Sequence, residues 1–423
     1  GLVGDAIGEG EIESLRGTAG IGHVRYPTAG GLDEDCAQPF SVSFKSGSLG
    51  LSHNGNLVNA DEVRADLERK GHAFTTAGDT EVIAHDIARN LLEEDLVRAI
   101  KHTMGRIHGS YSLTIMHDDT VMGLRDPEGN RPLAIGKLED GYVVASESAA
   151  IDAIGGDLVR DVRPGELVIL RPDDYDTYQL IDAERTAHCF FEHVYFARPD
   201  SIIDGRLVYE VRRELGRRLW DESGIDTDVV MPVPDSGRAF ASGYAEAADG
   251  VEFAEGLMKN RYVGRTFIMP TQDMRERAVR LKLNPIRSTV EGRSVTLIDD
   301  SIVRGTTSNQ LVTLLREAGA EEVHLRIGSP PIIAPCYMGI DMATREELMA
   351  ADKSIAEIRE AVGADSLEYL SIDAIAAAIG QPRENLCLAC VTGQYPYDVH
   401  GEERDREVTR PSVGAEAEAG ADD

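Results

Sequence analysis

The sequence predicts an α/β protein in which an α+β domain precedes a domain built on a parallel sheet, and two observations carry this prediction. Residues 198–365 alternate apolar strands with amphipathic helices, which is typical of a parallel sheet with helices on both faces. Residues 1–185 instead show short alternating strands and helices such as one expected over residues 79–90. A chain of 423 residues is long enough for two or three domains.

The stretch around Asp299 and Asp300 predicts a ligand site at the end of a strand. Residues 295–298 are expected to form a buried strand and residues 308–318 a helix. The turn between them offers unpaired backbone N–H groups, hydroxyls and the positive end of the helix, all of which favour a phosphate. The two carboxylates suit ribose hydroxyls or a hydrated Mg²⁺. A sugar phosphate bound with a metal ion is the implied ligand.

This stretch resembles the phosphoribosyltransferases, in which it binds phosphoribosyl pyrophosphate (PRPP). A second apolar strand at residues 228–233 ends in a Pro-Asp-Ser-Gly turn, and the resemblance implies that this turn contacts the pyrophosphate. Ser236 in the turn is then expected to ligate Mg²⁺ together with Asp299 and Asp300. The PRPP site that we expect comprises Lys259, Arg261, Asp299, Asp300, Ser301, Val303, Arg304, Gly305, Thr306 and Thr307.

Charge narrows the partners of the chain. The net charge of −31 argues against nucleic acid as a partner and favours a salt-rich cytoplasm, hence a halophilic source. Residues 259–293 oppose this trend with nine Lys or Arg against three Asp or Glu, as expected of a flap that closes over an anionic substrate.

No apolar run approaches the roughly 20 residues that span a bilayer, so we expect a cytoplasmic protein without a membrane partner.

Three motifs in the amino-terminal part, at residues 20–28, 51–56 and 77–81, together resemble the N-terminal-nucleophile glutaminases, also called class II glutamine amidotransferases. By this resemblance Arg25 pairs with the α-carboxylate of glutamine and Asp79 receives its α-ammonium group. The side chain of Asn54 and the backbone N–H of Gly55 would form the oxyanion hole, which stabilises the tetrahedral intermediate of amide cleavage.

A glutaminase followed by a PRPP-binding domain resembles the amidophosphoribosyltransferases, and residues 195–201 match that family as well. The resemblance implies a homotetramer that makes 5-phosphoribosylamine from PRPP and glutamine-derived ammonia, releasing pyrophosphate and glutamate, as the first step of purine biosynthesis. The family's nucleophile is a cysteine at the mature amino terminus, followed by a segment that this sequence lacks. We therefore expect about fifty residues to be absent before Gly1. Cys36 cannot replace the nucleophile because it lacks a free α-amine. We therefore expect that this chain uses ammonia but does not hydrolyse glutamine.

Four further cysteines predict a metal site, because oxidised pairs are not expected in a cytoplasmic enzyme. Zinc and an iron–sulfur cluster both accept four thiolates, and the spacing favours neither. One branch of the resembled family carries a [4Fe–4S] cluster on cysteines in these sequence contexts, which implies such a cluster here. The expected ligands are Cys189, Cys336, Cys387 and Cys390.

We expect a glutaminase domain over residues 1–185, a phosphoribosyltransferase domain over 186–365, a segment with two cluster ligands over 366–400, and a disordered acidic tail over 401–423. Three alternatives remain. A non-catalytic PRPP-binding regulator would need a nucleic-acid-binding module, for which the sequence shows no pattern. An iron–sulfur sensor would use the cysteines alone. A sugar-phosphate aminotransferase shares the glutaminase domain but lacks the Asp-Asp stretch.

Overall fold

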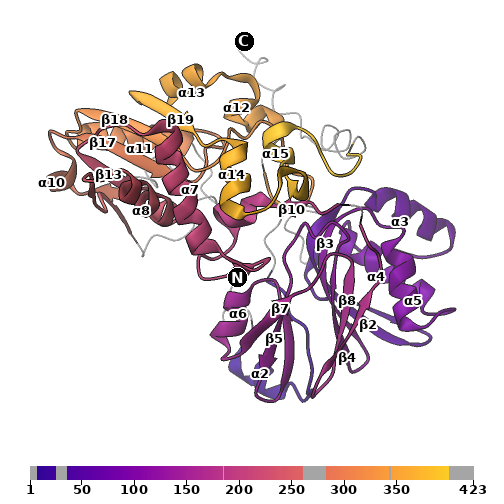
Figure 1. Cartoon of the computed structure of the whole chain (residues 1–423). Coiled ribbons are helices and arrows are strands. Elements are labelled where there is room, and N and C mark those ends of the chain that lie inside the picture. The colour runs from indigo at the N-terminus through magenta and orange to yellow at the C-terminus, as the bar shows by residue number, and fades with distance from the viewer. Residues whose placement is uncertain (1–6, 25–35, 184, 261–282, 343, 400–423) are drawn as a thin grey trace, which may run out of the picture.

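The computed structural model describes residues 7–24, 36–183, 185–260, 283–342 and 344–399, which form two lobes joined through the segment around β10 (His188–Cys189) (Figure 1). The amino-terminal lobe runs through β9 (Tyr175–Gln179), and the rest of the described chain builds the carboxyl-terminal lobe. None of the described helices combines the length and apolar character that crossing a bilayer requires.

The amino-terminal lobe is built on a six-stranded antiparallel sheet with the strand order β1-β2-β3-β4-β8-β9. Leu51 and Leu113 on this sheet pack against Ile83 and Ile87 of α4 in one apolar core. A second, three-stranded sheet of order β6-β5-β7 lies beside it. The elements of the lobe are α2 (Glu9–Ser14), β1 (Phe40–Phe44), β2 (Gly47–Leu57), α3 (Ala60–Arg69), α4 (Asp79–Asn90), α5 (Leu96–Met104), β3 (Gly109–His117), β4 (Thr120–Arg125), β5 (Ala134–Leu138), β6 (Gly141–Ala145), α6 (Ser148–Ala153), β7 (Asp157–Asp161), β8 (Glu166–Leu170) and β9.

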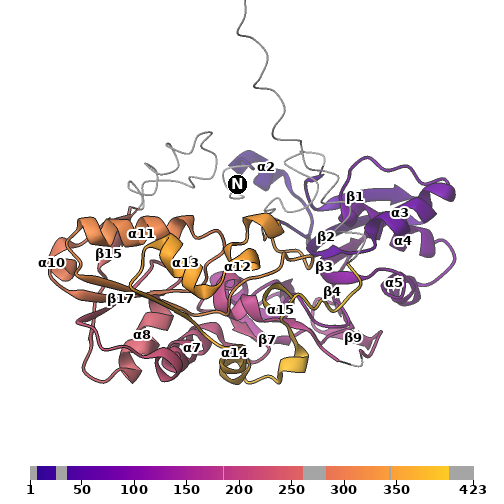
Figure 2. The same ribbon diagram turned by 90° about the horizontal axis from the view of Figure 1, so that it is seen from above.

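The carboxyl-terminal lobe is built on a five-stranded parallel sheet with the order β14-β13-β17-β18-β19. Its side chains alternate between two apolar cores, because successive strand residues point to opposite faces. Val295 and Leu297 pack with α11 and α13, whereas Ile298 packs with α7, α8 and α14. Figure 2 shows these two helical layers on either side of the sheet. The sheet and its covering helices are α7 (Val208–Ser223), β13 (Val229–Pro232), α8 (Arg238–Ala247), β14 (Glu252–Phe253), β17 (Ser294–Asp299), α11 (Thr306–Glu317), β18 (Glu322–Ile327), α13 (Ile355–Val362), β19 (Ser366–Tyr369) and α14 (Ile372–Ile379).

Short elements connect these layers and return the end of the described chain to the junction of the lobes. One of these short elements, β20, pairs in parallel with β10. They are η2 (Glu192–Phe196), β11 (Ile202–Ile203), β12 (Arg206–Leu207), β15 (Leu257–Lys259), β16 (Leu283–Pro285), α10 (Arg287–Val290), η4 (Arg345–Glu347), α12 (Met349–Asp352), η5 (Arg383–Asn385), β20 (Leu386–Cys387) and α15 (Ala389–Thr392).

The fold class predicted from the sequence is confirmed: an α+β domain precedes a parallel sheet with helices on both faces. The helix expected over residues 79–90 is α4, and the strand expected over 295–298 lies within β17. The helix expected to begin at Ser308 begins at Thr306, because Gly305 adopts the left-handed conformation (φ 73°) directly before it. The division expected after residue 365 runs through the sheet, since Leu367 of β19 pairs with Leu325 of β18. The acidic tail over 401–423 lies outside the described residues.

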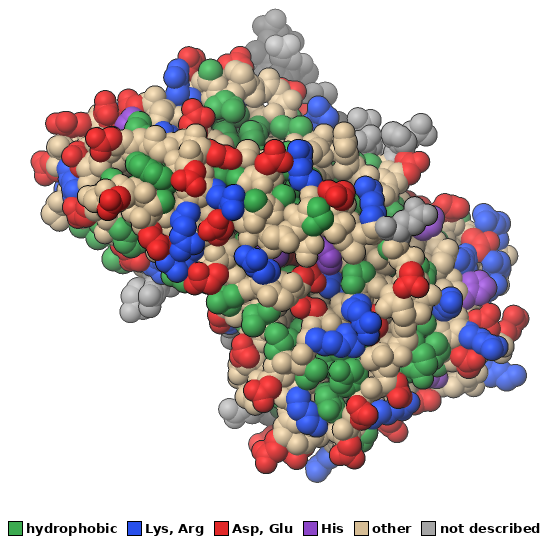
Figure 3. Space-filling view, in the orientation of Figure 1, with side chains coloured by type: hydrophobic (Ala, Val, Ile, Leu, Met, Phe, Trp, Pro, Cys, Tyr) green, Lys and Arg blue, Asp and Glu red, His purple; other side chains and the backbone are tan. Residues whose placement is uncertain are grey.

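Both kinds of charge cover the face of the molecule drawn in Figure 3. Asp and Glu side chains are spread over both lobes, with Lys and Arg side chains among them rather than gathered in one basic patch. On this face the described Lys and Arg side chains are therefore interspersed with acidic ones.

Candidate active site

The turn after β13 lies beside Asp299 and Asp300 because β13 and β17 are neighbouring parallel strands. Pro232 pairs with Ile298 in register, and the N–H of Val233 donates to the carbonyl of Ile298 at 2.8 Å. Parallel strands end at the same edge of a sheet, which is where α/β proteins bind ligands. Gly237 closes the turn tightly: a Cβ there would lie 2.5 Å from the carbonyl oxygen of Ile298.

The two carboxylates are buried and surrounded mainly by polar groups of their own strand end. Asp299 is 9% exposed and accepts from the N–H of Asp300 at 2.9 Å. Asp300 is 4% exposed and accepts from Ser301 Oγ at 2.6 Å, and the side chain of Ser236 also bonds to it. Burial and the neighbouring carboxylate raise the pKa of Asp299 well above its usual range. Burial likewise raises the pKa of Asp300, although the hydroxyls of Ser236 and Ser301 oppose this shift.

This donor set fits a hydrated Mg²⁺. Two buried carboxylates repel each other unless a cation or protons neutralise them, and the Ser236 hydroxyl adds a third oxygen at the same place. Carboxylates, hydroxyls and water are the ligands that Mg²⁺ prefers. Ser236, Asp299 and Asp300, named as metal ligands from the sequence, are therefore brought together by the fold.

The turn from Ser301 to Thr307 leads directly into the amino terminus of α11. Among the residues that the structure describes, no side chain caps this helix, so the N–H groups of its first turn are available to a ligand. Glycine is favoured at position 305 by its positive φ, and a Cβ there would also lie 2.4 Å from the sulfur of the flexible Met349 side chain. The N–H of Met349 also donates to the carbonyl of Val303 at 2.9 Å, which fixes the turn from its far side.

Two basic residues expected at the PRPP site lie near the paired turns. Lys259 Nζ is 2.6 Å from Asp235 Oδ2, next to Ser236. Arg304 forms an exposed ion pair with Glu347 at 3.2 Å. Arg261 and the flap that we expected lie outside the described residues, so only its two ends are seen, in β15 and β16.

Asn54 and Gly55 lie in β2, opposite Ser112 and Tyr111 of β3. Gly55 has a φ of 150° and approaches the neighbouring strand so closely that a Cβ would lie 2.1 Å from the carbonyl oxygen of Ser110. The backbone at this point therefore requires glycine. Arg25, expected at the glutamine carboxylate, lies outside the described residues, and Cys36 is half-buried just before β1.

Asp79 is the first residue of α4 and is tied to the strand that carries Asn54. Its Oδ2 accepts from the N–H of Leu57 at 3.0 Å, and its Oδ1 is 3.4 Å from His53 Nδ1. Burial raises the pKa of Asp79, but His53 and the backbone N–H groups outweigh it and lower the pKa below the usual value. Burial lowers the pKa of His53, and Asp79 more than compensates. Asp79 is thus an ionised carboxylate, as binding of an ammonium group requires.

Residues that sequence reasoning missed hold the loop before Asp79. The carboxylate of Glu81 accepts hydrogen bonds from the N–H and hydroxyl groups of both Thr75 and Thr76, at 2.7–3.0 Å. The guanidinium of Arg64 donates to the carbonyls of Thr76 and Gly78, both at 3.0 Å. Glu81 lies within the Gly-Asp-Thr-Glu motif, so the sequence contained this residue at a position of interest. The motif alone could not predict which groups its carboxylate would bind.

The four cysteines other than Cys36 converge at the junction of the lobes. Cys189 of β10 is the register partner of Cys387 of β20, and the carbonyl of Cys390 accepts from the N–H groups of Ile333 and Ala334, which precede Cys336. All four belong to one apolar cluster, and no disulfide joins them. Burial raises the pKa of Cys387 to about 11 and the pKa values of Cys189 and Cys390 well above their usual range.

Among the described residues, no three His, Cys, Asp or Glu side chains are close enough together to hold a metal ion as they stand. The thiols share one apolar cluster but are not in a metal-binding arrangement. The donor type is suitable for zinc or for iron–sulfur chemistry, and a bound metal would deprotonate these thiols despite their raised pKa values.

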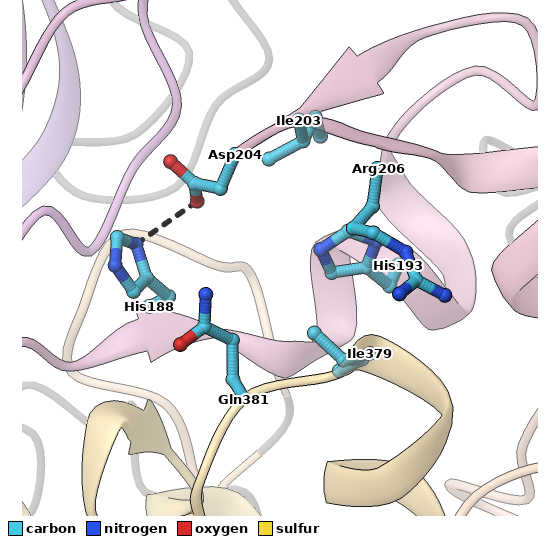
Figure 4. Close-up of a pocket in the computed structure, with 7 residues that line it drawn as sticks. All are labelled: His188, His193, Ile203, Asp204, Arg206, Ile379 and Gln381. Carbon is cyan, nitrogen blue, oxygen red and sulfur yellow. Dashed lines mark ion pairs between the residues drawn. The ribbon is translucent and has the colours of Figure 1, made fainter.

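A cavity behind β10 is lined by His188, Asp204, Gln381 and neighbouring side chains (Figure 4). The carboxylate of Asp204 is occupied, because His188 Nδ1 lies 3.0 Å away and Arg125 Nη1 2.9 Å away. Burial raises the pKa of Asp204, but Arg125 and His188 lower it further than burial raises it. Arg125 ends β4 of the first lobe, so this network joins the two lobes, and we assign it no ligand.

The structure thus has two candidate half-sites: a glutamine half-site at Asn54, Gly55 and Asp79, and a PRPP half-site at Ser236 and residues 299–307. This combination is that of a glutamine amidotransferase domain joined to a parallel-sheet domain. Residues 27–153 match the family described as "Glutamine amidotransferase domain". The amidophosphoribosyltransferase of Archaeoglobus fulgidus is 50% identical over 406 residues, covering 95% of this chain and 89% of that protein. The enzyme of that name from Bacillus subtilis is 46% identical, covering 95% of this chain and 85% of its own length. The chain belongs to the amidophosphoribosyltransferase family.

Solved structures support the same family. One, described as the allosteric regulatory enzyme of purine biosynthesis, has a TM-score of 0.89 at 46% identity and covers 95% of this chain and 87% of its own. Another is glutamine PRPP amidotransferase from Bacillus subtilis complexed with ADP and GMP, with a TM-score of 0.83 at 46% identity, covering 89% of this chain and 83% of its own. The resemblance to amidophosphoribosyltransferases stated from the motifs is thereby confirmed.

Proposed function

We propose that the chain forms 5-phosphoribosylamine from PRPP and ammonia released from glutamine, with pyrophosphate and glutamate as the other products. One observation carries this proposal: a single chain holds the buried Asp299–Asp300 pair facing Ser236, and also the Asn54–Gly55 strand tied to Asp79. The first arrangement suits a pyrophosphorylated sugar, and the second suits cleavage of an amide. Relatives that share these regions are named for this reaction.

In the PRPP half of the reaction the chain binds and orients both ends of the substrate. The uncapped N–H groups of Thr306 and Thr307 receive the 5-phosphate at the positive end of α11. Asp299 and Asp300 accept from the ribose hydroxyls, and the turn at Ser236 faces the pyrophosphate. One Mg²⁺ held by Ser236, Asp299 and Asp300 would supply positive charge for the leaving pyrophosphate.

The bond changes at the sugar are then a simple substitution. Ammonia attacks the anomeric carbon of PRPP, the carbon–oxygen bond to pyrophosphate breaks with its electron pair, and the new ammonium group loses one proton to solvent. Lys259, Arg261 and Arg304 provide positive charge near the anionic substrate, and Ser301, Val303 and Gly305 shape the turn that surrounds it.

In the glutamine half, Arg25 and Asp79 bind the two charged groups of the amino acid. Asn54 and the N–H of Gly55 stabilise the negative charge that develops on the amide oxygen during cleavage. We assign no role to Cys36.

We also propose that Cys189, Cys336, Cys387 and Cys390 hold one [4Fe–4S] cluster per subunit. The convergence of four cysteines from three segments at the junction of the lobes, two of them buried and two half-buried, supports this proposal. Iron at about four atoms per chain and visible absorbance in anaerobically purified protein are expected. One zinc per chain, or protein that keeps its fold and its activity with Mg²⁺ but without any iron, would contradict the cluster.

The remaining expectations are proposals of the same kind. We assign residues 1–185 to the glutaminase domain and the later described residues to the phosphoribosyltransferase domain with its cysteine-bearing segment. A homotetramer, an acidic surface adapted to high salt and a cytoplasmic location accompany this assignment. A regulator without catalysis or an iron–sulfur sensor would bind PRPP or report oxidation without releasing pyrophosphate.

The direct test supplies PRPP, Mg²⁺ and ammonium chloride and measures pyrophosphate. The double variant Asp299→Asn/Asp300→Asn should lose at least about 10²-fold in rate, because it removes both negative charges at the substrate. The matched control is Asp173→Asn/Asp174→Asn, an acidic pair between β8 and β9 that lies outside the sheet edge. Wild-type protein that releases no pyrophosphate, or equal rates for both double variants, would refute the proposed function.

A further inference from the structure

The side-chain amide of Asn54 has a defined orientation, because an arginine faces it. Arg131 Nη2 lies 3.2 Å from Asn54 Oδ1. A guanidinium carries only donors, so the oxygen of the amide must face Arg131 and the NH₂ group must point the other way. An oxyanion hole needs a donor, not an acceptor, so this orientation is the one that amide cleavage requires.

Arg131 is itself fixed by buried partners. Its side chain forms an ion pair with Glu192, with 2.9 Å between Nη1 and Oε1, and the two residues are 7% and 4% exposed. Its backbone carbonyl accepts from Ser112 Oγ and from Arg125 Nε, each at 2.9 Å. Ser112 is the register partner of Asn54, so the arginine is attached to the strand beside its target. A buried ion pair of this kind is costly to disrupt from one side.

Glu192 belongs to the segment of the cysteine cluster. It begins η2 three positions after Cys189 in the sequence. A nearby position of the same strand meets a second cysteine-bearing segment: Asn56 Nδ2 donates to the carbonyl of Tyr337 at 3.1 Å, directly after Cys336. The glutamine half-site therefore rests on the two segments that carry Cys189 and Cys336.

We propose that Arg131 is a positioning residue for glutamine cleavage, which orients the Asn54 amide and ties it through Glu192 to the segment of Cys189. This inference rests on the proposed function and assigns part of its glutamine specificity to a side chain that contacts no substrate. The oxyanion donors of this chain are thereby coupled to the packing of the cysteine cluster, whereas the ammonia-driven reaction at Asp299 is independent of Arg131.

The test compares glutamine-driven and ammonia-driven pyrophosphate release in the purified protein. Arg131→Met combined with Glu192→Gln removes the guanidinium group that donates to Asn54. Because both charges of the ion pair are removed together, no buried unpaired charge is left. The kcat with glutamine should fall about 10²-fold, the size of effect seen when one oxyanion donor is lost. The KM for glutamine and the ammonia-driven rate should each stay within about threefold of wild type, because neither depends on the orientation of the amide.

Arg131→Lys serves as the conservative variant, since lysine keeps the charge opposite Glu192 and one donor for Asn54. It should recover at least about tenfold in kcat over the double variant. Arg160→Gln is the control, because it breaks another Arg–Glu ion pair, between the part-exposed Arg160 and the buried Glu166 of the amino-terminal lobe, without contact to Asn54. It should leave the ratio of glutamine-driven to ammonia-driven rates unchanged.

Three results would overturn the inference: an unchanged kcat with glutamine in the double variant, an equal loss of both activities, or a lysine variant no better than the double variant. An equal loss would indicate a merely structural role. Absence of ammonia-driven activity in the wild-type protein would instead refute the proposed function, so the two failures are distinguishable.

Discussion

The two half-sites of this protein are built in different ways. The PRPP half-site consists almost entirely of consecutive residues at one strand end, from Asp299 to Thr307, with Ser236 from the neighbouring strand. The glutamine half-site uses a short Asn-Gly sequence whose geometry depends on distant residues, among them Arg131 and Glu192. A local site tolerates changes elsewhere in the molecule, whereas a site supported from a distance is sensitive to the packing of both lobes.

The sharpest way to test this difference is to add one methyl group at each half-site. Gly55→Ala should have the largest effect, because its Cβ would lie 2.1 Å from the Ser110 carbonyl oxygen at a φ of 150°. We expect a loss of stability of about 3 kcal/mol or more and no measurable glutamine-driven activity. Thermal unfolding and the two assays measure both effects.

Gly71→Ala is the control for that variant, because Gly71 also has a positive φ of 93° but no atom lies within 4 Å of its Cβ position. It should lose only about 1 kcal/mol, the cost of the backbone conformation alone. Similar stability in the two variants would contradict the close approach at Gly55.

Gly305→Ala should have an intermediate effect, confined to the PRPP half-site. Its Cβ would meet the sulfur of Met349 at 2.4 Å, and this flexible side chain can move aside. We expect about 1–2 kcal/mol of destabilisation from the positive φ, and a KM for PRPP raised by about tenfold because the phosphate turn shifts. Gly393→Ala is the matched control, with the same φ of 73° and open space around it. Equal KM values for PRPP in the two variants would disprove this role of the turn.

The smallest expected effect concerns pH and the pair of His53 and Asp79. The folded pKa of His53 is raised above 6.5, so its contribution is complete below that pH and is lost as pH rises through the folded value. The folded pKa of Asp79 is lowered below 3.8, so its contribution is complete above that pH and is lost as pH falls. The pair therefore stabilises the fold most between these two values.

His53→Gln should consequently cost about 1 kcal/mol at pH 5–6 and less at pH 8–9. Denaturant unfolding of both proteins across this range provides the measurement. A stability difference that does not change with pH would show that His53 acts through packing and not through its charge. Ammonia-driven activity should remain close to wild type, since the pair lies in the other lobe.

The parts that could be predicted from the sequence are those that consecutive residues encode. The Asp-Asp stretch contains a strand, a turn and a helix in order, and the structure places Ser236 beside Asp300 as expected. The support of Asn54 by Arg131 could not be predicted, because the two lie 77 residues apart in the chain and meet only through sheet register. The same limit applies to the pairing of β19 with β18, because β19 is short and its pairing leaves no local signal in the sequence.

The pairing of β10 with β20 has a consequence for the order in which the chain folds during synthesis. The hydrogen bond from Thr186 to the carbonyl of Asn385, beside this pair, spans 199 residues. Contacts of such sequence separation form late, after the intervening sheet has been assembled. Because ribosomal synthesis delivers Cys387 and Cys390 after all the strands of the two main sheets, the junction that supports the first lobe is completed only after both sheets have emerged.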